Sequence, residues 1–274
     1  MLRDIEGVRL NVLDEGSGQA VVFLHGLGGC WHDWEPQIET WRTDHRVIVI
    51  EHRGHGRSDR APGPYSTDLF AADALAVLRH LGVDHAHVVG LSMGGMIAHK
   101  LAVAAPEVVD TLVLCDTFWR TGSAGQAGLR MVADIVRDNG MGAVNDLFSA
   151  QAGDGVGVGD VLSTASGAVQ RNNLRDAEGN DPHCWAWAAE AVAAHDMTED
   201  KGQVRVPALV VWGENDVAVP LKLAQPLADA VGADGVVVLE GADHVCNLDA
   251  PDAFDAALRA FFAAHPVAPS ASPG

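Results

Sequence analysis

The chain has 274 residues, 48% of them hydrophobic, which is enough to bury a large core. It carries 37 Asp and Glu against 18 Lys and Arg, a formal net charge of −19. We therefore expect neither nucleic acid nor an anionic membrane as a partner, because both require a basic surface. Four scattered cysteines, no signal peptide and no apolar run long enough to span a bilayer predict a cytoplasmic protein with free thiols.

The hydrophobic pattern predicts alternating strands and helices. In chain order these are strands at 2–6, 8–14, 20–24 and 46–50, a helix at 68–81 capped by Thr67, a strand ending at 88–89, a helix at 93–105, a strand at 111–115, helical stretches at 129–138 and 184–195, strands at 208–212 and 236–240, and a helix at 253–264. Such alternation indicates an α/β fold with a mainly parallel twisted sheet flanked by helices.

Two composition shifts divide the chain. Residues 117–203 contain no buried five-residue strand, and residues 266–274 are rich in Pro, Ser and Ala. We expect residues 1–116 and 204–265 to form one core. A helical cap at 117–203 would then be inserted after the strand ending near Asp116, and 266–274 would be a flexible tail.

The pentapeptide G-L-S-M-G at residues 90–94 directly follows an apolar strand and directly precedes a helical segment. A serine at such a sharp turn is an exposed nucleophile, and small residues two positions on either side let the chain fold past itself. The same turn directs the backbone N–H of Met93 at the oxygen of a bound carbonyl group. Ser92 is therefore the predicted nucleophile, and Met93 N–H is one predicted oxyanion donor.

A glycine-rich loop, H-G-L-G-G at residues 25–29, follows the strand at 20–24. Glycines let backbone N–H groups face a ligand, and the second oxyanion donor of such a site comes from the loop after an early strand. Leu27 N–H is the predicted donor. We expect His25 to orient this loop by hydrogen bonding rather than to transfer protons.

A base and an acid follow two later strands. Asp216 follows the strand at 208–212, and His244 follows the strand at 236–240. The base would take the serine proton and return it to the leaving group, while the acid would orient the imidazole. Ser92, His244 and Asp216 thus form the predicted catalytic triad. Asp116, which follows the strand at 111–115, is the alternative acid.

The motifs H-G-L-G at 25–28, R-G-H-G-R-S at 53–58 and G-L-S-M-G at 90–94, with the chain order Ser, Asp, His, resemble the α/β-hydrolase superfamily. The segments L-C-D-T at 114–117 and 188–196 are most similar to 3-oxoadipate enol-lactonases and related small carboxylesterases. The resemblance implies the α/β-hydrolase fold with a helical cap. Haloalkane dehalogenases and epoxide hydrolases of this superfamily carry aspartate at the elbow, so Ser92 disfavours those activities.

These features predict a serine hydrolase that cleaves a small-molecule carboxylic ester or lactone through an acyl-enzyme. The alternatives are a carbon–carbon bond hydrolase or a perhydrolase of the same fold, and, in another class, a ligand receptor with little turnover. No metal-ligand spacing is present, so we expect no metal and no cofactor.

The substrate pocket is predicted from residues of the cap. Trp119, Trp185 and Trp187 are candidates to line an apolar pocket, and packing between cap helices is their alternative role. Arg171 and Arg175 lie four apart, so on a helix they would share a face and could bind a substrate carboxylate. Simple exposure to solvent is the alternative for both arginines.

Overall fold

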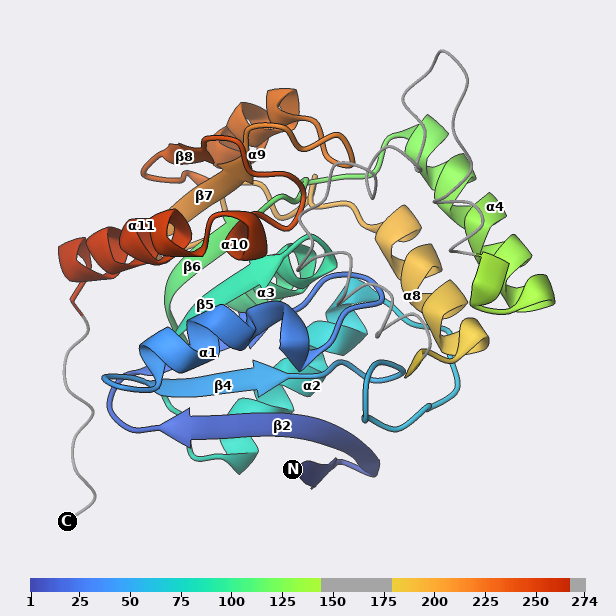
Figure 1. Cartoon of the computed structure of the whole chain (residues 1–274), viewed down its shortest axis with the longest axis horizontal. Helices are drawn as coiled ribbons and strands as arrows, with labels where there is room; N and C mark the ends of the chain where they lie inside the picture. Colours follow the sequence, from blue (N-terminus) through green and yellow to red (C-terminus); the bar gives the residue numbers. More distant parts are fainter. Residues whose placement is uncertain (144–178, 267–274) are drawn as a thin grey trace.

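The computed structural model describes residues 1–143 and 179–266. Eight strands form one sheet in the order β1-β2-β4-β3-β5-β6-β7-β8 (Figure 1). Their bounds are β1 Leu2–Ile5, β2 Val8–Gly16, β3 Ala20–Leu24, β4 Arg46–Ile50, β5 Ala86–Leu91, β6 Val109–Cys115, β7 Ala208–Gly213 and β8 Val236–Leu239. β2 runs antiparallel to β1 and β4, and the strands from β4 to β8 are parallel. This confirms the predicted mainly parallel α/β sheet.

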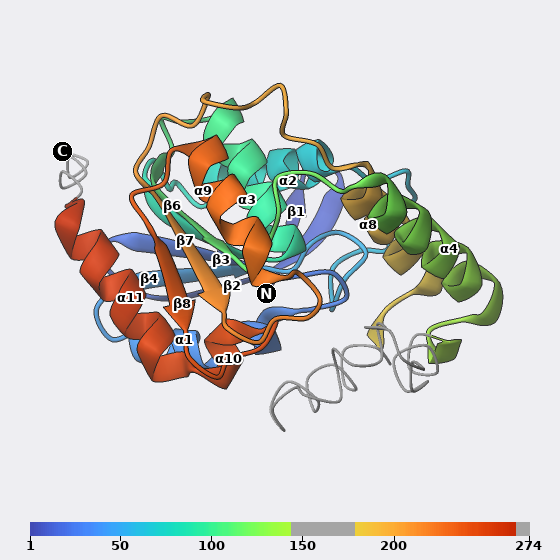
Figure 2. The same ribbon diagram turned by 90° about the horizontal axis from the view of Figure 1, so that it is seen from above.

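Helices cover both faces of the sheet (Figure 2). One face packs against α2 (Thr67–His80), α3 (Met93–Ala104) and α9 (Ala224–Val231), and the other against α1 (Glu35–Trp41), α10 (Cys246–Asp249) and α11 (Pro251–Ala264). Short 3-10 turns precede α1 at Trp31–Trp34 and α9 at Leu221–Leu223. Because both faces are covered, β3 and β5 are buried along their whole length; β3 is apolar throughout, and the one polar side chain of β5 is that of His87.

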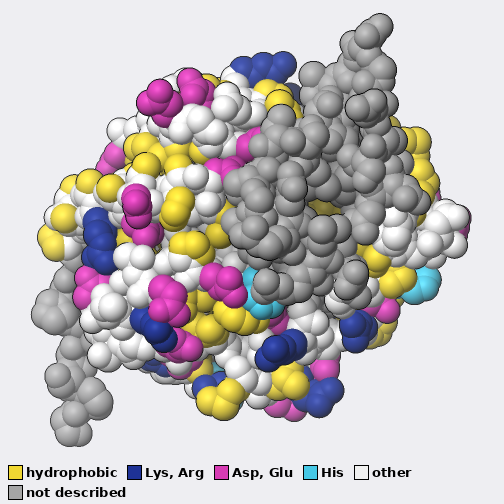
Figure 3. All heavy atoms as spheres, in the orientation of Figure 1, with side chains coloured by type: hydrophobic (Ala, Val, Ile, Leu, Met, Phe, Trp, Pro, Cys, Tyr) yellow, Lys and Arg dark blue, Asp and Glu magenta, His cyan; other side chains and the backbone are white. Residues whose placement is uncertain are grey.

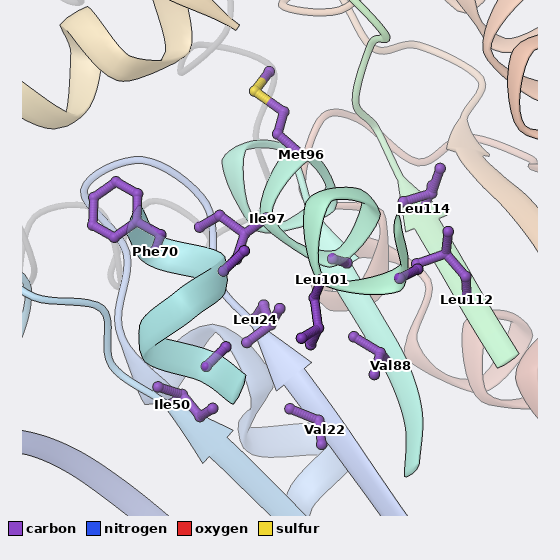
Figure 4. Packing of buried hydrophobic residues seen from close by; sticks show 14 of the residues in the cluster. Val22, Leu24, Ile50, Phe70, Val88, Met96, Ile97, Leu101, Leu112 and Leu114 are labelled. Atoms are coloured by element: carbon purple, nitrogen blue, oxygen red, sulfur yellow. The ribbon is translucent and has the colours of Figure 1, made fainter. Parts of the chain in front are cut away.

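The alternation of side chains along a strand divides the core into two layers. In β3, Val22 and Leu24 point to the layer of α2 and α3, whereas Val21 and Phe23 point to the layer of α1 and α11. Figure 4 shows the first layer, where Phe70 of α2 and side chains of α3 lie over the strands. The sheet is thus held from both sides, and its strand ends are rigid supports for loops.

Between β6 and β7, the described residues include two helices, α4 (Ser123–Asn139) and α8 (Pro182–Ala194). They pack side by side at one end of the sheet (Figures 1 and 2). The chain leaves and returns through adjacent segments, since Met197 N–H donates to Trp119 O at 2.8 Å and Thr121 N–H donates to His195 O at 3.1 Å. We call α4 and α8 the helical pair.

One predicted helix start was wrong by one residue. Ser66, not Thr67, is the N-cap of α2, because its hydroxyl accepts from Leu69 N–H at 3.0 Å. Thr67 is the first helical residue, and its hydroxyl is hydrogen-bonded to His195 Nδ1 at 3.1 Å. The two hydroxyl residues are adjacent, and the contact with His195 comes from a distant part of the chain.

The surface is charged and mixed. On the face in Figure 3, acidic side chains are interspersed with basic and apolar ones. Among the described residues, surface ion pairs include Arg42 with Glu15 and Arg259 with Asp44. None of the helices in the described ranges is long and apolar enough to cross a membrane.

Candidate active site

Ser92 lies in the turn between β5 and α3 with a left-handed backbone, φ 54°. A Cβ atom added to Gly90 would lie 2.2 Å from Gly94 O, and one added to Gly94 would lie 2.0 Å from Leu24 O. No side chain fits at either position. The two glycines therefore allow the close approach of β3, β5 and α3 that forces the chain to turn at the serine.

A hydrogen-bonded chain connects three segments that are distant in the sequence. His244 Nε2 lies 3.2 Å from Ser92 Oγ, and His244 Nδ1 lies 2.9 Å from Asp216 Oδ2. The second oxygen of Asp216 accepts from Val219 N–H at 2.8 Å. The structure thus brings together the predicted serine, histidine and aspartate, with the imidazole between the hydroxyl and the carboxylate.

Opposing effects act on the imidazole of His244. Burial lowers its pKa, whereas the charge and hydrogen bond of Asp216 and the charges of Asp116 and Asp243 raise it, and the net result is a pKa of about 9. Asp243 also accepts from His244 N–H at 2.9 Å. The carboxylates around His244 therefore stabilise its protonated form, which arises when the serine loses its proton.

Asp116, the alternative acid of the sequence, has other partners. Its Oδ1 accepts from Gly213 N–H at 2.7 Å, and its Oδ2 accepts from Cys246 N–H at 3.3 Å. The side chain is fully buried. The carboxylate that is hydrogen-bonded to the imidazole of His244 is that of Asp216.

The loop after β3 forms a turn beside the serine. Gly29 N–H donates to Gly26 O at 3.2 Å, and Gly28 has φ 78°, as the third residue of a type II turn does. A Cβ atom added to Gly26 would lie 3.4 Å from Ser92 Cβ. Leu27 N–H is therefore presented close to the serine.

The other predicted oxyanion donor is at the start of α3. Met93 is the first helical residue, so its N–H lies among the N-terminal groups that have no acceptor within the helix. These N–H groups form the positive end of the helix dipole. Met93 directly follows Ser92 in the chain, and Leu27 directly follows Gly26, which lies next to the serine.

His25 is buried beneath the loop at 25–29. Its Nε2 accepts from His52 N–H at 3.1 Å, so its Nδ1 carries the proton and donates to Gly26 O at 2.8 Å. Burial, with the nearby His52 and His55, keeps the pKa of His25 well below the ordinary value, and the ring is neutral. These two bonds fix the backbone that leads to Leu27.

The predicted pocket residues are placed differently from one another. Trp185 is buried over the loop at 25–29, where a Cβ atom added to Gly28 would lie 2.9 Å from its Nε1. Trp187 packs against Tyr65 with ring centroids 5.6 Å apart, and Trp119 lies under the guanidinium of Arg120 at 5.2 Å. Only the first of these contacts is with a loop that carries a predicted site residue.

The two predicted arginines, Arg171 and Arg175, lie outside the described residues. The sequence did not predict a contact that Asn180, five residues after Arg175, makes with the loop at 25–29. Asn180 Nδ2 donates to Gly28 O at 2.7 Å, across 152 positions in the sequence. An isolated asparagine just before a helix carries no sequence signal for such a contact.

No metal site is evident in the described part of the chain. Residues 1–143 and 179–266 contain no group of three or more His, Cys, Asp or Glu side chains that could hold an ion. Cys30, Cys115, Cys184 and Cys246 are all buried.

Comparison with known proteins places this geometry in a family. The family model described as the alpha/beta hydrolase fold matches residues 19–251. The chain belongs to this family. Its mainly parallel sheet with helices on both faces is the fold of α/β hydrolases (Figure 1).

Three similar proteins show the range of the family. The chain is 28% identical to 3-oxoadipate enol-lactonase 2 of Acinetobacter baylyi, over 93% of either chain. A thermophilic esterase from Thermogutta terrifontis is 26% identical with a TM-score of 0.81, covering 94% of this chain and 95% of the esterase. A bromoperoxidase from Bacillus anthracis shares the fold, with a TM-score of 0.83, 21% identity and coverage of 96% and 99%.

Proposed function

We propose that this hydrolase cleaves a carboxylic ester or lactone of a small molecule through an acyl-enzyme on Ser92. The observation that carries the proposal is the continuous hydrogen-bonded chain from Ser92 Oγ through His244 to Asp216. A serine hydroxyl is too weakly acidic to attack an acyl carbon unaided, so it needs a base within hydrogen-bond reach. His244 Nε2 is at that distance.

The reaction would proceed in two steps. Ser92 Oγ attacks the carbonyl carbon while its proton passes to His244 Nε2, and the oxyanion accepts hydrogen bonds from the backbone N–H groups of Leu27 and Met93. The carbon–oxygen bond then breaks, and the proton passes from His244 to the departing alkoxide. Water, activated by the same imidazole, attacks the acyl-enzyme and releases the acid.

Asp216 would have two roles in this mechanism. Its Oδ2 accepts from His244 Nδ1, which leaves Nε2 free to accept the serine proton. Its negative charge stabilises the imidazolium that forms during attack. The Val219 N–H bond to Oδ1 keeps the carboxylate in the orientation that serves both roles.

The similarity to an enol-lactonase and to an esterase supports an acyl–oxygen bond as the one cleaved. In a lactone the acyl and alkoxide halves stay joined, so ring opening leaves the alkoxide tethered next to His244. We propose that the helical pair forms a cap over this site and contributes to substrate choice, because Trp185 and Asn180 both contact the loop at 25–29.

The test is turnover of a panel containing aryl esters, an aryl carbamate, simple lactones and a carboxylated enol-lactone. Intact mass spectrometry after treatment with a fluorophosphonate reports the nucleophile independently of the substrate. We expect hydrolysis of an ester or lactone and one adduct on Ser92, both absent in Ser92→Ala. Activity that persists in Ser92→Ala would refute the proposal. Adduct formation without turnover of any panel member would favour a ligand receptor.

A further inference from the structure

The segment 115–117 at the end of β6 lies where the three parts of the proposed triad meet. Ser92 N–H donates to Cys115 O at 2.8 Å, and Thr117 Oγ1 donates to Ser92 O at 2.8 Å. Both bonds hold the backbone of the serine turn. Asp116 lies between these two residues, and its side chain is directed to the other two parts of the triad.

The carboxylate of Asp116 bridges two loops. Gly213 N–H, which donates to Oδ1 at 2.7 Å, is three residues before Asp216, and Cys246 N–H, which donates to Oδ2 at 3.3 Å, is two residues after His244. One buried side chain therefore ties the loop that carries the acid to the loop that carries the base. The bond between His244 and Asp216 depends on the relative position of these two loops.

The two bonds require a carboxylate and not an amide. Both partners are backbone N–H donors, so both side-chain oxygens must accept. An asparagine would have one acceptor and one NH₂ group, and that NH₂ would face an N–H. The backbone itself would accept asparagine, because Asp116 has φ 44° and asparagine tolerates the left-handed region well.

We propose that Asp116 is a positioning residue for the hydrolysis carried out by Ser92. Its carboxylate holds the loops of Asp216 and His244 in their relative position, and its charge stabilises the imidazolium of His244. This inference rests on the proposed function, because it gives Asp116 a role only if His244 acts as the base. It also explains why a carboxyl group is retained in a fully buried position.

The charges around Asp116 predict the direction in which its removal changes the pKa of His244. Burial raises the pKa of Asp116 to about 7; the charge of His244 opposes this and that of Asp216 adds to it. The thiols of Cys115 and Cys246 pack nearby, and burial raises their pKa well above the ordinary value, so they are neutral. Asp116 is therefore ionised above pH 7, throughout the range in which His244, with its pKa of about 9, loses its proton.

The test compares Asp116→Asn with Asp255→Asn in the full chain. Asp255 is a matched control, because burial raises the pKa of this carboxyl too, but its Oδ1 accepts from Trp41 Nε1 at 2.7 Å in the layer of α1 and α11. The pKa of His244 is measured by NMR titration of its imidazole nitrogens, assigned with His244→Gln. The dependence of kcat/KM on pH and the melting temperature are measured on the same variants.

We expect Asp116→Asn to lower the pKa of His244 by roughly one unit, because it removes a nearby negative charge. The acid limb of kcat/KM should move to lower pH by the same amount. The plateau of kcat/KM at high pH should fall about ten- to a hundredfold, because the backbone N–H of either Gly213 or Cys246 loses its carboxylate acceptor. Asp255→Asn should leave both the pKa of His244 and the plateau unchanged, whatever its melting temperature.

Two results would overturn the proposal. One is a pKa of His244 that is the same in Asp116→Asn as in the wild type. The other is a plateau of kcat/KM no lower in Asp116→Asn than in Asp255→Asn. The NMR titration needs no substrate. If the protein hydrolysed no substrate, the proposed function would be refuted, but the change in the pKa of His244 would still test the effect of Asp116 on its imidazole.

Discussion

The strand-end loops and the helical pair contact each other but are held in place differently. The loops that carry Ser92, Asp216 and His244 are fixed by buried hydrogen bonds to backbone and carboxylate groups. The helical pair is held by apolar contacts: Ala133 and Val136 of α4 pack against Trp185, Ala186 and Ala189 of α8, and the other side of α8 packs into the main core through Cys184, Ala188, Ala191 and Val192. The residues just before α8 form polar bonds to the loops of the sheet: Asn180 Nδ2 donates to Gly28 O at 2.7 Å, and Arg60 Nη2 donates to Gly179 O at 2.9 Å.

This difference separates chemistry from substrate choice. A reaction that needs atoms placed to within tenths of an ångström belongs on elements that are bonded on all sides, and the strand ends meet that condition. Segments with few bonds to the sheet can change without disturbing those atoms. Substitutions at the strand ends should therefore affect every substrate, whereas substitutions in the helical pair should affect substrates unequally.

The largest expected effect is that of Ser92→Ala. Removing the hydroxyl removes the attacking atom, so kcat should fall by about 10⁶, the size seen when a triad nucleophile is lost. Circular dichroism and the melting temperature should be unchanged, because alanine fits the same turn. Ser66→Ala is the matched control: it removes the N-cap of α2 and should cost about 1 kcal/mol of stability while kcat stays at the wild-type value. A residual kcat within a hundredfold of wild type would remove Ser92 from the mechanism.

Asp216→Asn should have the next largest effect. The asparagine oxygen can keep the bond from Val219 N–H, but its NH₂ group would then donate to His244 Nδ1 and place the ring proton on Nε2. A ring protonated at Nε2 cannot accept the serine proton, so kcat should fall about 10⁴-fold. Steady-state kinetics at a saturating aryl ester measure this. A larger loss in Asp116→Asn than in Asp216→Asn would move the role of acid to Asp116.

The same two regions differ in how well the sequence predicts them. The serine turn and the loop at 25–29 are contiguous motifs, so a few letters specify both the local backbone and the chemistry. The acid of the triad is harder to predict, because Asp116 and Asp216 both follow strands of the same sheet. In the structure, the directions of their side chains distinguish them. The sequence predicts Asp216 as the acid and keeps Asp116 as the alternative, and it gives no sign that one buried carboxylate bridges two loops.

The helical pair shows a second limit of prediction from the sequence. Helices at 129–138 and 184–195 were predicted from periodicity, and α4 and α8 extend over these stretches. Periodicity says which residues are apolar but not what an apolar side chain meets. Trp185 and Trp187 are two positions apart, yet one covers the loop at 25–29 and the other packs on Tyr65.

The pH dependence tests the electrostatics of the strand-end site. An ordinary histidine would place the acid limb of kcat/KM near pH 6.5. Burial and the surrounding carboxylates bring the pKa of His244 to about 9, and only the neutral ring can accept the serine proton. We therefore expect kcat/KM to rise from pH 7 to pH 9, by about tenfold per pH unit while the ring is mostly protonated. A plateau already reached at pH 7.5, on a substrate whose chemical step is rate-limiting, would contradict this.

The smallest effect should come from the contact between the two regions. Asn180→Ala removes the donor to Gly28 O and loosens the turn that presents Leu27 N–H, so we expect kcat/KM for an aryl ester to fall about tenfold. The loss should be mainly in kcat, because an oxyanion donor is needed most in the transition state. Asn139→Ala is the matched control, since Asn139 Nδ2 donates to Ile135 O at 2.9 Å on the exposed end of α4. Equal kinetics for the two variants would mean that the strand-end loops hold the oxyanion donors unaided. A loss in Asn180→Ala alone would show that the helical pair supports the chemistry as well as the choice of substrate.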